Sequence, residues 1–198
     1  MEYKGKVYIS PKYKKTDYLK LKLTNSSKDE DWAQAIRIFE DRIKGRFLNQ
    51  IDSMLTDVRF NGFAIMALNC LLIETLMQFR YGYEETPRKK NKEKYSFFLL
   101  NEFPNVFTSA DIAMRFYEDI RCGILHSAQT KNDAILTDQS RYIIELKNGV
   151  FSVSVLCLSS ELKKYIDSYC IELADRNQKN TRTAFVKKMN YICTRNTN

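Results

Sequence analysis

Residues 63–81 read FAIMALNCLLIETLMQFRY, and apolar side chains occupy nearly every face of the helix that this composition predicts. Between Phe63 and Phe79 the polar interruptions are Asn69, Glu74, Thr75 and Gln78. Because of them the run falls short of the roughly 20 clean apolar residues that span a bilayer. We therefore expect the central helix of a helical bundle, beginning after Gly62 and ending at Gly82, and no membrane span.

On either side of this helix the spacing of apolar residues predicts further helices. Over residues 29–58 the apolar positions recur three or four residues apart, at Trp32, Ile36, Phe39, Ile43, Phe47, Ile51 and Leu55. A short helix is expected over residues 95–103, closed by Pro104. Another is expected over residues 110–128, capped by Thr108 or Ser109.

The sequence Asn148-Gly149 lies between two β-rich runs and predicts a small β-hairpin over residues 142–156. A last main helix is expected from Ser159 or Ser160 to about Asp175. The predicted fold class is therefore all-α, a helical bundle over residues 29–175 with one inserted hairpin.

Basic residues gather at the two ends of the chain and in one internal segment. Residues 1–28 form a predicted basic arm, with seven lysines and interleaved tyrosines among the first 22 residues. Residues 176–198 form a predicted basic tail with six Lys or Arg and no acidic residue. The expected internal loop, between residues 84 and 94, carries Arg88, Lys89, Lys90, Lys92 and Lys94. These clusters suit a polyanion, and we expect the internal cluster to bind RNA.

Composition excludes several classes of site. The chain has 198 residues, 32 Lys+Arg against 24 Asp+Glu, a net charge of +8, five cysteines and one histidine. A single histidine excludes a two-imidazole zinc helix, and no C-x-x-C pair or glycine-rich phosphate loop is present. We expect neither a metal nor another cofactor. The widely spaced, odd set of cysteines and the lack of an apolar leader predict reduced thiols in the cytoplasm.

The predicted helix over residues 110–128 holds the only histidine. On a helical wheel one face carries Ile112, Ala113, Phe116, Tyr117, Ile120, Gly123 and Ile124, and it is expected to pack on the bundle. Asp119, Cys122 and His126 fall on the opposite, polar face, and Arg121 lies at the border. Arg121 and His126 are about 140° apart with about 7.5 Å of rise, so a straight helix does not aim them at one atom. A loosened helix end after Gly123, or pairing with a second copy, would bring them together.

The segment Arg121-Cys-Gly-Ile-Leu-His126, late in a helix of a small α-bundle, resembles the Arg, four to six residues, His signature of the HEPN superfamily. The surrounding stretch, residues 116–126, follows the apolar helix segment 67–75 as in bacterial HEPN proteins of defence and toxin loci. The specific part of the resemblance covers about eleven residues, within a region of similarity over residues 30–175.

The resemblance implies a metal-independent endoribonuclease that acts as a homodimer, with paired motif helices lining a cleft. Cleavage would leave a 2′,3′-cyclic phosphate and a 5′-hydroxyl. His126 would act as the acid and base, and Arg121 would stabilise the phosphate charge. Antiviral defence or a toxin–antitoxin system is the expected setting, with an antitoxin or a defence-system protein as a further partner.

Three other residues have expected supporting roles or structural ones. Glu74 needs a partner in its apolar helix and would hold Arg121 or Arg115. Asp119 is spaced to pair with Arg115, or to orient His126. Cys122 stands where active HEPN members often have a polar residue.

Two alternatives remain at the level of sequence. Cys122 favours a HEPN-like subunit that binds RNA, nucleotide or a partner protein without cleaving. A transcription regulator that uses the basic tail on duplex DNA is the other, although no helix-turn-helix with a short glycine turn is evident. Members silenced by adenylylation carry a tyrosine two residues after the histidine, where this chain has Ala128.

Overall fold

The computed structural model describes residues 1–3 and 5–194, and in this range the chain is mostly helical with two small sheets. Its contacts divide it into two compact units. The first unit comprises Met1–Gln50, Gln78–Glu85 and the chain from Lys164 onward, and the second comprises Ile51–Met77 and Thr86–Lys163. We describe each unit by itself.

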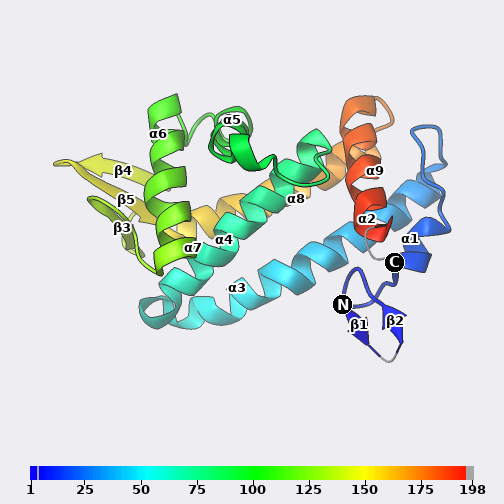
Figure 1. The fold of residues 1–198 in the computed structure, drawn as a ribbon, viewed down its shortest axis with the longest axis horizontal. Coiled ribbons are helices and arrows are strands. Elements are labelled where there is room, and N and C mark those ends of the chain that lie inside the picture. Colours follow the sequence, from blue (N-terminus) through cyan, green and yellow to red (C-terminus); the bar gives the residue numbers. More distant parts are fainter. Residues whose placement is uncertain (4, 195–198) are drawn as a thin grey trace. The chain divides into compact units, whose positions relative to one another are not determined.

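The first unit is built from helices and one short β-ribbon (Figure 1). Its elements in chain order are β1 (Glu2–Tyr3), β2 (Lys6–Val7), α1 (Lys15–Leu19), α2 (Asp29–Ile43), the π-helical turn η1 (Lys44–Leu48), the start of α3 (Asn49–Met54), the end of α4 (Val58–Tyr81), the end of α8 (Val155–Ala174) and α9 (Lys179–Thr194). Strands β1 and β2 pair antiparallel, with Glu2 opposite Val7.

Aromatic side chains form the core of this unit. Phe39 of α2 lies edge-on to Phe79 of α4 at 4.8 Å between ring centroids, and Phe185 of α9 contacts both rings. The buried guanidinium of Arg182 lies over the Trp32 ring at 4.3 Å and donates to two carbonyls at the end of α8. These donors satisfy carbonyls that a helix end leaves without partners.

Both basic ends of the chain, the predicted arm (residues 1–28) and the predicted tail (176–198), contribute buried side chains to this core in their described parts. Within the arm, Ile9 and Tyr18 are buried, and α1 contacts α9. Within the tail, Phe185 and Met189 of α9 have no exposed surface. Both segments are highly charged, and the apolar side chains between their basic residues still become buried.

The second unit combines helices with a three-stranded sheet. Its elements are the end of α3, a short 3₁₀ turn η2 (Leu55–Asp57), most of α4, a second 3₁₀ turn η3 (Arg88–Lys90), α5 (Asn91–Glu102), α6 (Ala110–Arg115), the π-helical turn η4 (Phe116–Cys122), α7 (Gly123–Ser127), β3 (Ala134–Thr137), β4 (Ile144–Lys147), β5 (Val150–Ser154) and the start of α8.

The predicted hairpin is present, since β4 and β5 pair antiparallel around the turn at Asn148-Gly149. The mostly helical fold that the sequence predicts is confirmed. The prediction omitted β3, which pairs parallel with β5 and extends the hairpin to a three-stranded sheet. Helix α8 begins at Val155, immediately after β5, and not at Ser159 or Ser160. The hydroxyl of Ser159 donates to the carbonyl of Val155 inside the helix.

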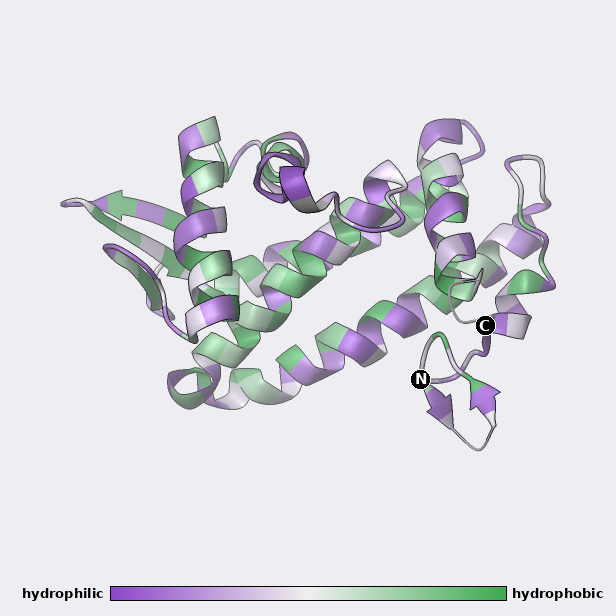
Figure 2. Cartoon of the chain, viewed as in Figure 1, coloured by the Kyte–Doolittle hydropathy of each residue, from purple (hydrophilic) through white to green (hydrophobic). Residues whose placement is uncertain are grey.

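Helix α4 carries mostly hydrophobic residues, whereas α2 alternates hydrophobic and hydrophilic ones (Figure 2). The helix begins at Val58, so Gly62 lies inside it and the predicted break falls at Leu55–Asp57. Among the described residues one helical run, Asp29–Tyr81, is long and apolar enough to cross a membrane by length and composition. The core helix of a soluble protein passes the same test, and Ile65, Met66 and Cys70 of α4 have no exposed surface.

Candidate functional site

The helix that carries the Arg121–His126 motif is capped at both ends, and its N-cap is one of the two residues that the sequence predicts. The Ser109 hydroxyl accepts a hydrogen bond from the Ile112 amide at 3.3 Å and caps α6. Ala128 ends α7 in the left-handed conformation, with φ of 53°. Between α6 and α7 the turn η4 is π-helical, a form that often marks functional positions in helices. Arg121 and Cys122 are its last two residues.

Arg121 points into the unit toward α4. Its Nη2 donates to Oε2 of Glu74 at 2.9 Å, and its guanidinium lies 5.3 Å from the centre of the Tyr117 ring. The side chains of Arg121 and Glu74 are 11% and 18% exposed. Burial opposes the charge on Arg121, but the hydrogen bond and attraction from Glu74 outweigh it and raise the arginine pKa above its ordinary value. The prediction that Glu74 has a partner is therefore confirmed, and that partner is Arg121.

The other two guanidinium nitrogens of Arg121, Nη1 and Nε, have weaker hydrogen-bond partners or none among the described residues. Nη1 of Arg121 lies 3.9 Å from Sγ of the half-buried Cys122, and Nε is buried without a hydrogen-bond partner. Burial raises the pKa of Tyr117 to about 12, although the charge of Arg121 pulls it down. Tyr117 thus remains a neutral phenol beside the arginine at physiological pH. Helical periodicity placed Tyr117 on the core face but gave no sign of its contact with Arg121.

Asp119 is almost fully buried, at 3% exposure, and not on the polar face that the wheel predicted. Its Oδ2 accepts from Arg115 Nε at 3.2 Å, and its Oδ1 accepts from Asn132 Nδ2 at 2.7 Å. The predicted ion pair with Arg115 is confirmed. The described residues show no bond from Asp119 to His126, because the carboxylate is already directed at Arg115 and at Asn132 in the loop after α7.

This loop returns onto the motif helix at Gly123. A Cβ on Gly123 would lie 2.5 Å from the carbonyl oxygen of Gln129 and 3.2 Å from the amide nitrogen of Lys131. The Lys131 amide also donates to the carbonyl of Asp119 at 2.9 Å. Glycine is needed inside the motif because the backbone of the next loop packs directly against it. Sequence alone suggested a loosened helix end here, but the helix continues through Gly123 to Ser127.

His126 is exposed in the last turn of α7, where the negative end of the helix dipole favours a positive charge. Within the part of the chain that the structure describes, no hydrogen bond or ion pair joins His126 to Arg121. The arginine faces α4 and the histidine faces solvent. A single chain therefore does not bring the two motif residues together.

The internal basic cluster is more structured than the predicted loop. Arg88, Lys89 and Lys90 form the turn η3, and Lys92 and Lys94 belong to the first turn of α5, which begins at Asn91 and not at Tyr95. Lys89 and Lys90 are exposed, Lys92 and Lys94 are half-buried, and the side chain of Arg88 lies outside the described part. Lys92 pairs with Glu118 on η4 at 2.5 Å, so this end of the cluster adjoins the motif helix.

Two aromatic contacts connect α4, α5 and η4. The Tyr95 hydroxyl donates to the backbone carbonyl of Cys70 at 3.3 Å, and its ring meets that of Tyr117 edge-on at 5.3 Å. On the other side of the motif helix the guanidinium of Arg115 lies over Phe151 of β5 at 4.9 Å. The sheet and α5 therefore fix the rotation of the motif helix.

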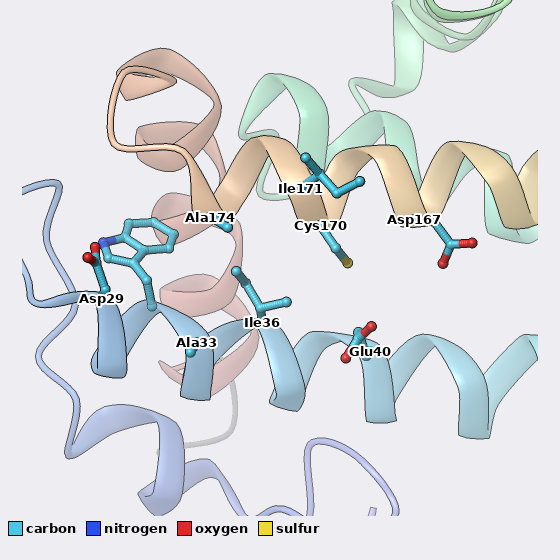
Figure 3. A pocket seen from close by; sticks show the side chains of 9 residues that line it. Asp29, Ala33, Ile36, Glu40, Asp167, Cys170, Ile171 and Ala174 are labelled. Carbon is cyan, nitrogen blue, oxygen red and sulfur yellow. The ribbon is translucent and has the colours of Figure 1, made fainter.

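No group of three or more His, Cys, Asp and Glu that could hold a metal ion occurs among residues 1–3 and 5–194. A groove of the first unit, between α2 and α8, has a volume of about 520 Å³ (Figure 3). Ile36 and Cys170 face one another across it, and Glu40 and Asp167 flank them (Figure 3). Burial, with the nearby carboxylates of Glu40 and Asp167, raises the pKa of Cys170 to about 12. This acidic groove does not suit a phosphate backbone.

Comparison with protein-family models gave no match to this chain, and neither curated proteins nor solved structures gave one.

Proposed function

We propose that this chain is a metal-independent endoribonuclease of the HEPN type, in which two copies combine Arg121 and His126 in a shared cleft. The observation that carries the proposal is the position of the motif on one capped helix. The structure fixes Arg121 through Glu74 and Tyr117, and it leaves His126 exposed five residues later. A group that must meet RNA at a shared cleft needs this exposure, and a group that must keep its charge needs a fixed partner.

The proposed reaction needs one proton acceptor, one proton donor and one positive charge. A His126 imidazole takes the proton of the ribose 2′-hydroxyl, and the 2′-oxygen attacks the adjacent phosphorus. The 5′-oxygen leaves with a proton donated by a protonated His126. The products are therefore a 2′,3′-cyclic phosphate and a 5′-hydroxyl. Arg121 stabilises the charge on the phosphate through Nη1, whose one hydrogen-bond acceptor among residues 1–3 and 5–194 is the weak acceptor Sγ of Cys122.

The separate environments of the two residues support the proposed homodimer. Arg121 faces α4 and His126 faces solvent, so a second motif helix is needed to place a histidine and an arginine at one phosphate. The basic residues Lys89 and Lys90 are exposed and could contact the RNA backbone next to this cleft, since α5 adjoins η4. We propose a cytoplasmic role in antiviral defence or a toxin–antitoxin system, with an antitoxin or defence protein as regulator.

The deciding experiment incubates purified protein with total RNA and tRNA in EDTA and maps the RNA ends. The parent is compared with His126→Ala and with Ser127→Ala, an exposed neighbour on the same helix turn. Loss of an acid or base costs about 10²- to 10⁴-fold in rate, so we expect His126→Ala to lose cleavage and Ser127→Ala to retain it. Because His126 is exposed, both variants should fold normally. Equal cleavage by His126→Ala and the parent would remove the histidine from the mechanism.

A second candidate function is a HEPN-like subunit that binds RNA or nucleotide without cleaving it. The observation in its favour is that Glu74 neutralises Arg121 and that a thiol, Cys122, lies at the remaining edge. The same experiment separates the two candidates. No cleavage by the parent, together with RNA retained in a gel shift, supports the binding subunit.

A further inference from the structure

A pair of arginines without a carboxylate partner lies in the first unit, on α2 and the π-helical turn η1. Arg42 Nη1 and Arg46 Nη2 both donate to the backbone carbonyl of Ile9, at 2.5 and 3.2 Å. The two guanidinium groups are therefore neighbours. Among the described residues neither has an ion pair, and burial together with the charge of Arg46 lowers the pKa of Arg42 to about 10. Two close cations in a partly buried place call for an anion.

The space around these arginines has two adjoining parts. A polar hollow of about 240 Å³ is lined by Arg42, Arg46 and Lys188, among others. An apolar hollow of about 470 Å³ is lined by Tyr3, Tyr8 and Pro11, among others. Tyr8 and Arg46 belong to both hollows, so the two parts share one wall.

The donors in the polar hollow are available to a ligand. Arg46 is exposed, and no nitrogen of the half-buried Arg42 is both buried and without a partner, so the guanidinium N–H groups that Ile9 does not use reach solvent. Lys188 donates to the carbonyl of Glu84 at 2.6 Å, and its side chain lines the hollow. Three cationic side chains therefore line a hollow with room for a phosphate group.

The floor of the apolar hollow is shaped by a glycine. Pro11 packs so closely on Gly45 that a Cβ at this position would overlap the proline ring. Gly45 is the second residue of η1, and the wide turn continues through Arg46. The same π-helical turn thus admits Pro11 to the floor and carries Arg46 at the wall.

We propose that this double hollow binds a nucleoside phosphate, with the phosphate on Arg42 and Arg46 and the base against Tyr8. Arginine forks match phosphate oxygens, and an aromatic ring accepts any base by stacking. The ligand is either a free nucleotide or one nucleotide of an RNA strand, since both present this chemistry. The site uses none of the motif residues and does not depend on cleavage.

The test measures binding to the full chain and does not use activity. The probes are 5′-AMP, adenosine, inorganic phosphate and a fluorescent 2′-O-methyl RNA dodecamer, which lacks the 2′-hydroxyl that cleavage requires. Arg46→Gln is compared with Lys44→Gln, which removes the same charge from an exposed position on the same turn. We expect Arg46→Gln to weaken 5′-AMP or the dodecamer about tenfold, and Lys44→Gln to change it less than about twofold.

A second variant tests the apolar half. Tyr8→Leu keeps an apolar side chain but removes the ring, so it should weaken 5′-AMP and leave the binding of inorganic phosphate unchanged. Tighter binding of the dodecamer than of 5′-AMP assigns the site to RNA, and the reverse assigns it to a free nucleotide. Binding of neither probe, equal effects of the Arg46 and Lys44 variants, or adenosine binding as tightly as 5′-AMP would overturn the proposal.

Discussion

Replacing Glu74 by glutamine removes the carboxylate that faces Arg121 and keeps an amide of nearly the same shape. The pair is short, at 2.9 Å, and its side chains are 11% and 18% exposed. Removing one partner of a fully buried ion pair costs about 3–5 kcal/mol, because the remaining charge stays in a poor solvent. The residual exposure lets water reach the orphaned guanidinium, so we expect the free energy of unfolding to fall by about 2 kcal/mol.

Urea denaturation of Glu74→Gln, Arg121→Met and the double variant gives the coupling between the two residues. We expect a coupling of about 2 kcal/mol, at the upper part of the range for residues in contact. Glu118→Gln is the matched control, because its partner Lys92 also lies at hydrogen-bond distance but the two side chains are 55% and 41% exposed. This control should change stability by less than about 0.5 kcal/mol.

The reasoning would be refuted by a coupling below about 0.5 kcal/mol between positions 74 and 121. The pair would then behave as a surface ion pair, and Glu74 would not hold the arginine. Cleavage assays on the same variants add a second readout. If Glu74 positions Arg121, Glu74→Gln should lower the rate of RNA cleavage although it leaves His126 in place.

Three further predictions concern stability. Gly123→Ala should destabilise the protein by about 2 kcal/mol in urea denaturation, because the new Cβ meets the carbonyl of Gln129. Gly62→Ala is the control. Its Cβ would have no neighbour nearer than 3.9 Å, so it should stabilise the helix by up to about 1 kcal/mol. Arg182→Met should cost about 2 kcal/mol by thermal denaturation, since it frees two carbonyls at the end of α8, and a loss below about 0.5 kcal/mol would contradict this role. Burial raises the pKa of Cys70 to about 12, so the thiol ionises first in the unfolded chain and the free energy of unfolding should fall as pH rises above about 8.5. Cys70→Ala should make this fall with pH less steep in reducing buffer. An unchanged pH dependence would exclude Cys70 as its cause.

Local signals in the sequence predicted most of the helices. The capping hydroxyl of Ser109, the start of α2 at Asp29 and the Asn-Gly hairpin are all observed, because each depends on a few neighbouring residues. Strand β3 was missed because its parallel partner β5 lies beyond β4 in sequence, and no short pattern specifies such a pairing. The burial of α1 and α9 was missed because charge density concealed their apolar residues.

The sequence predicted which side chains of the candidate site form ion pairs, but it did not predict the direction in which Asp119 points. Glu74 required a partner and Asp119 was spaced to meet Arg115, and both expectations are confirmed. The helical wheel assumed a uniform turn and therefore placed Asp119 beside His126 on the polar face. The π-helical turn η4 breaks that assumption, and Asp119 is buried against Asn132 instead.

The two π-helical turns, η1 and η4, have a consequence for how this chain can change in length. Such a turn holds one residue more than the α-helical hydrogen-bond pattern needs, so deleting one residue there restores that pattern. A deletion elsewhere in α2 or α4 would instead rotate the rest of the helix by about 100° and misplace its apolar face. Arg46 and Arg121 both lie in the wide turns. Single-residue deletions at these two places should therefore abolish ligand binding or catalysis in otherwise folded proteins, and they mark where related chains can lose an activity without losing the fold.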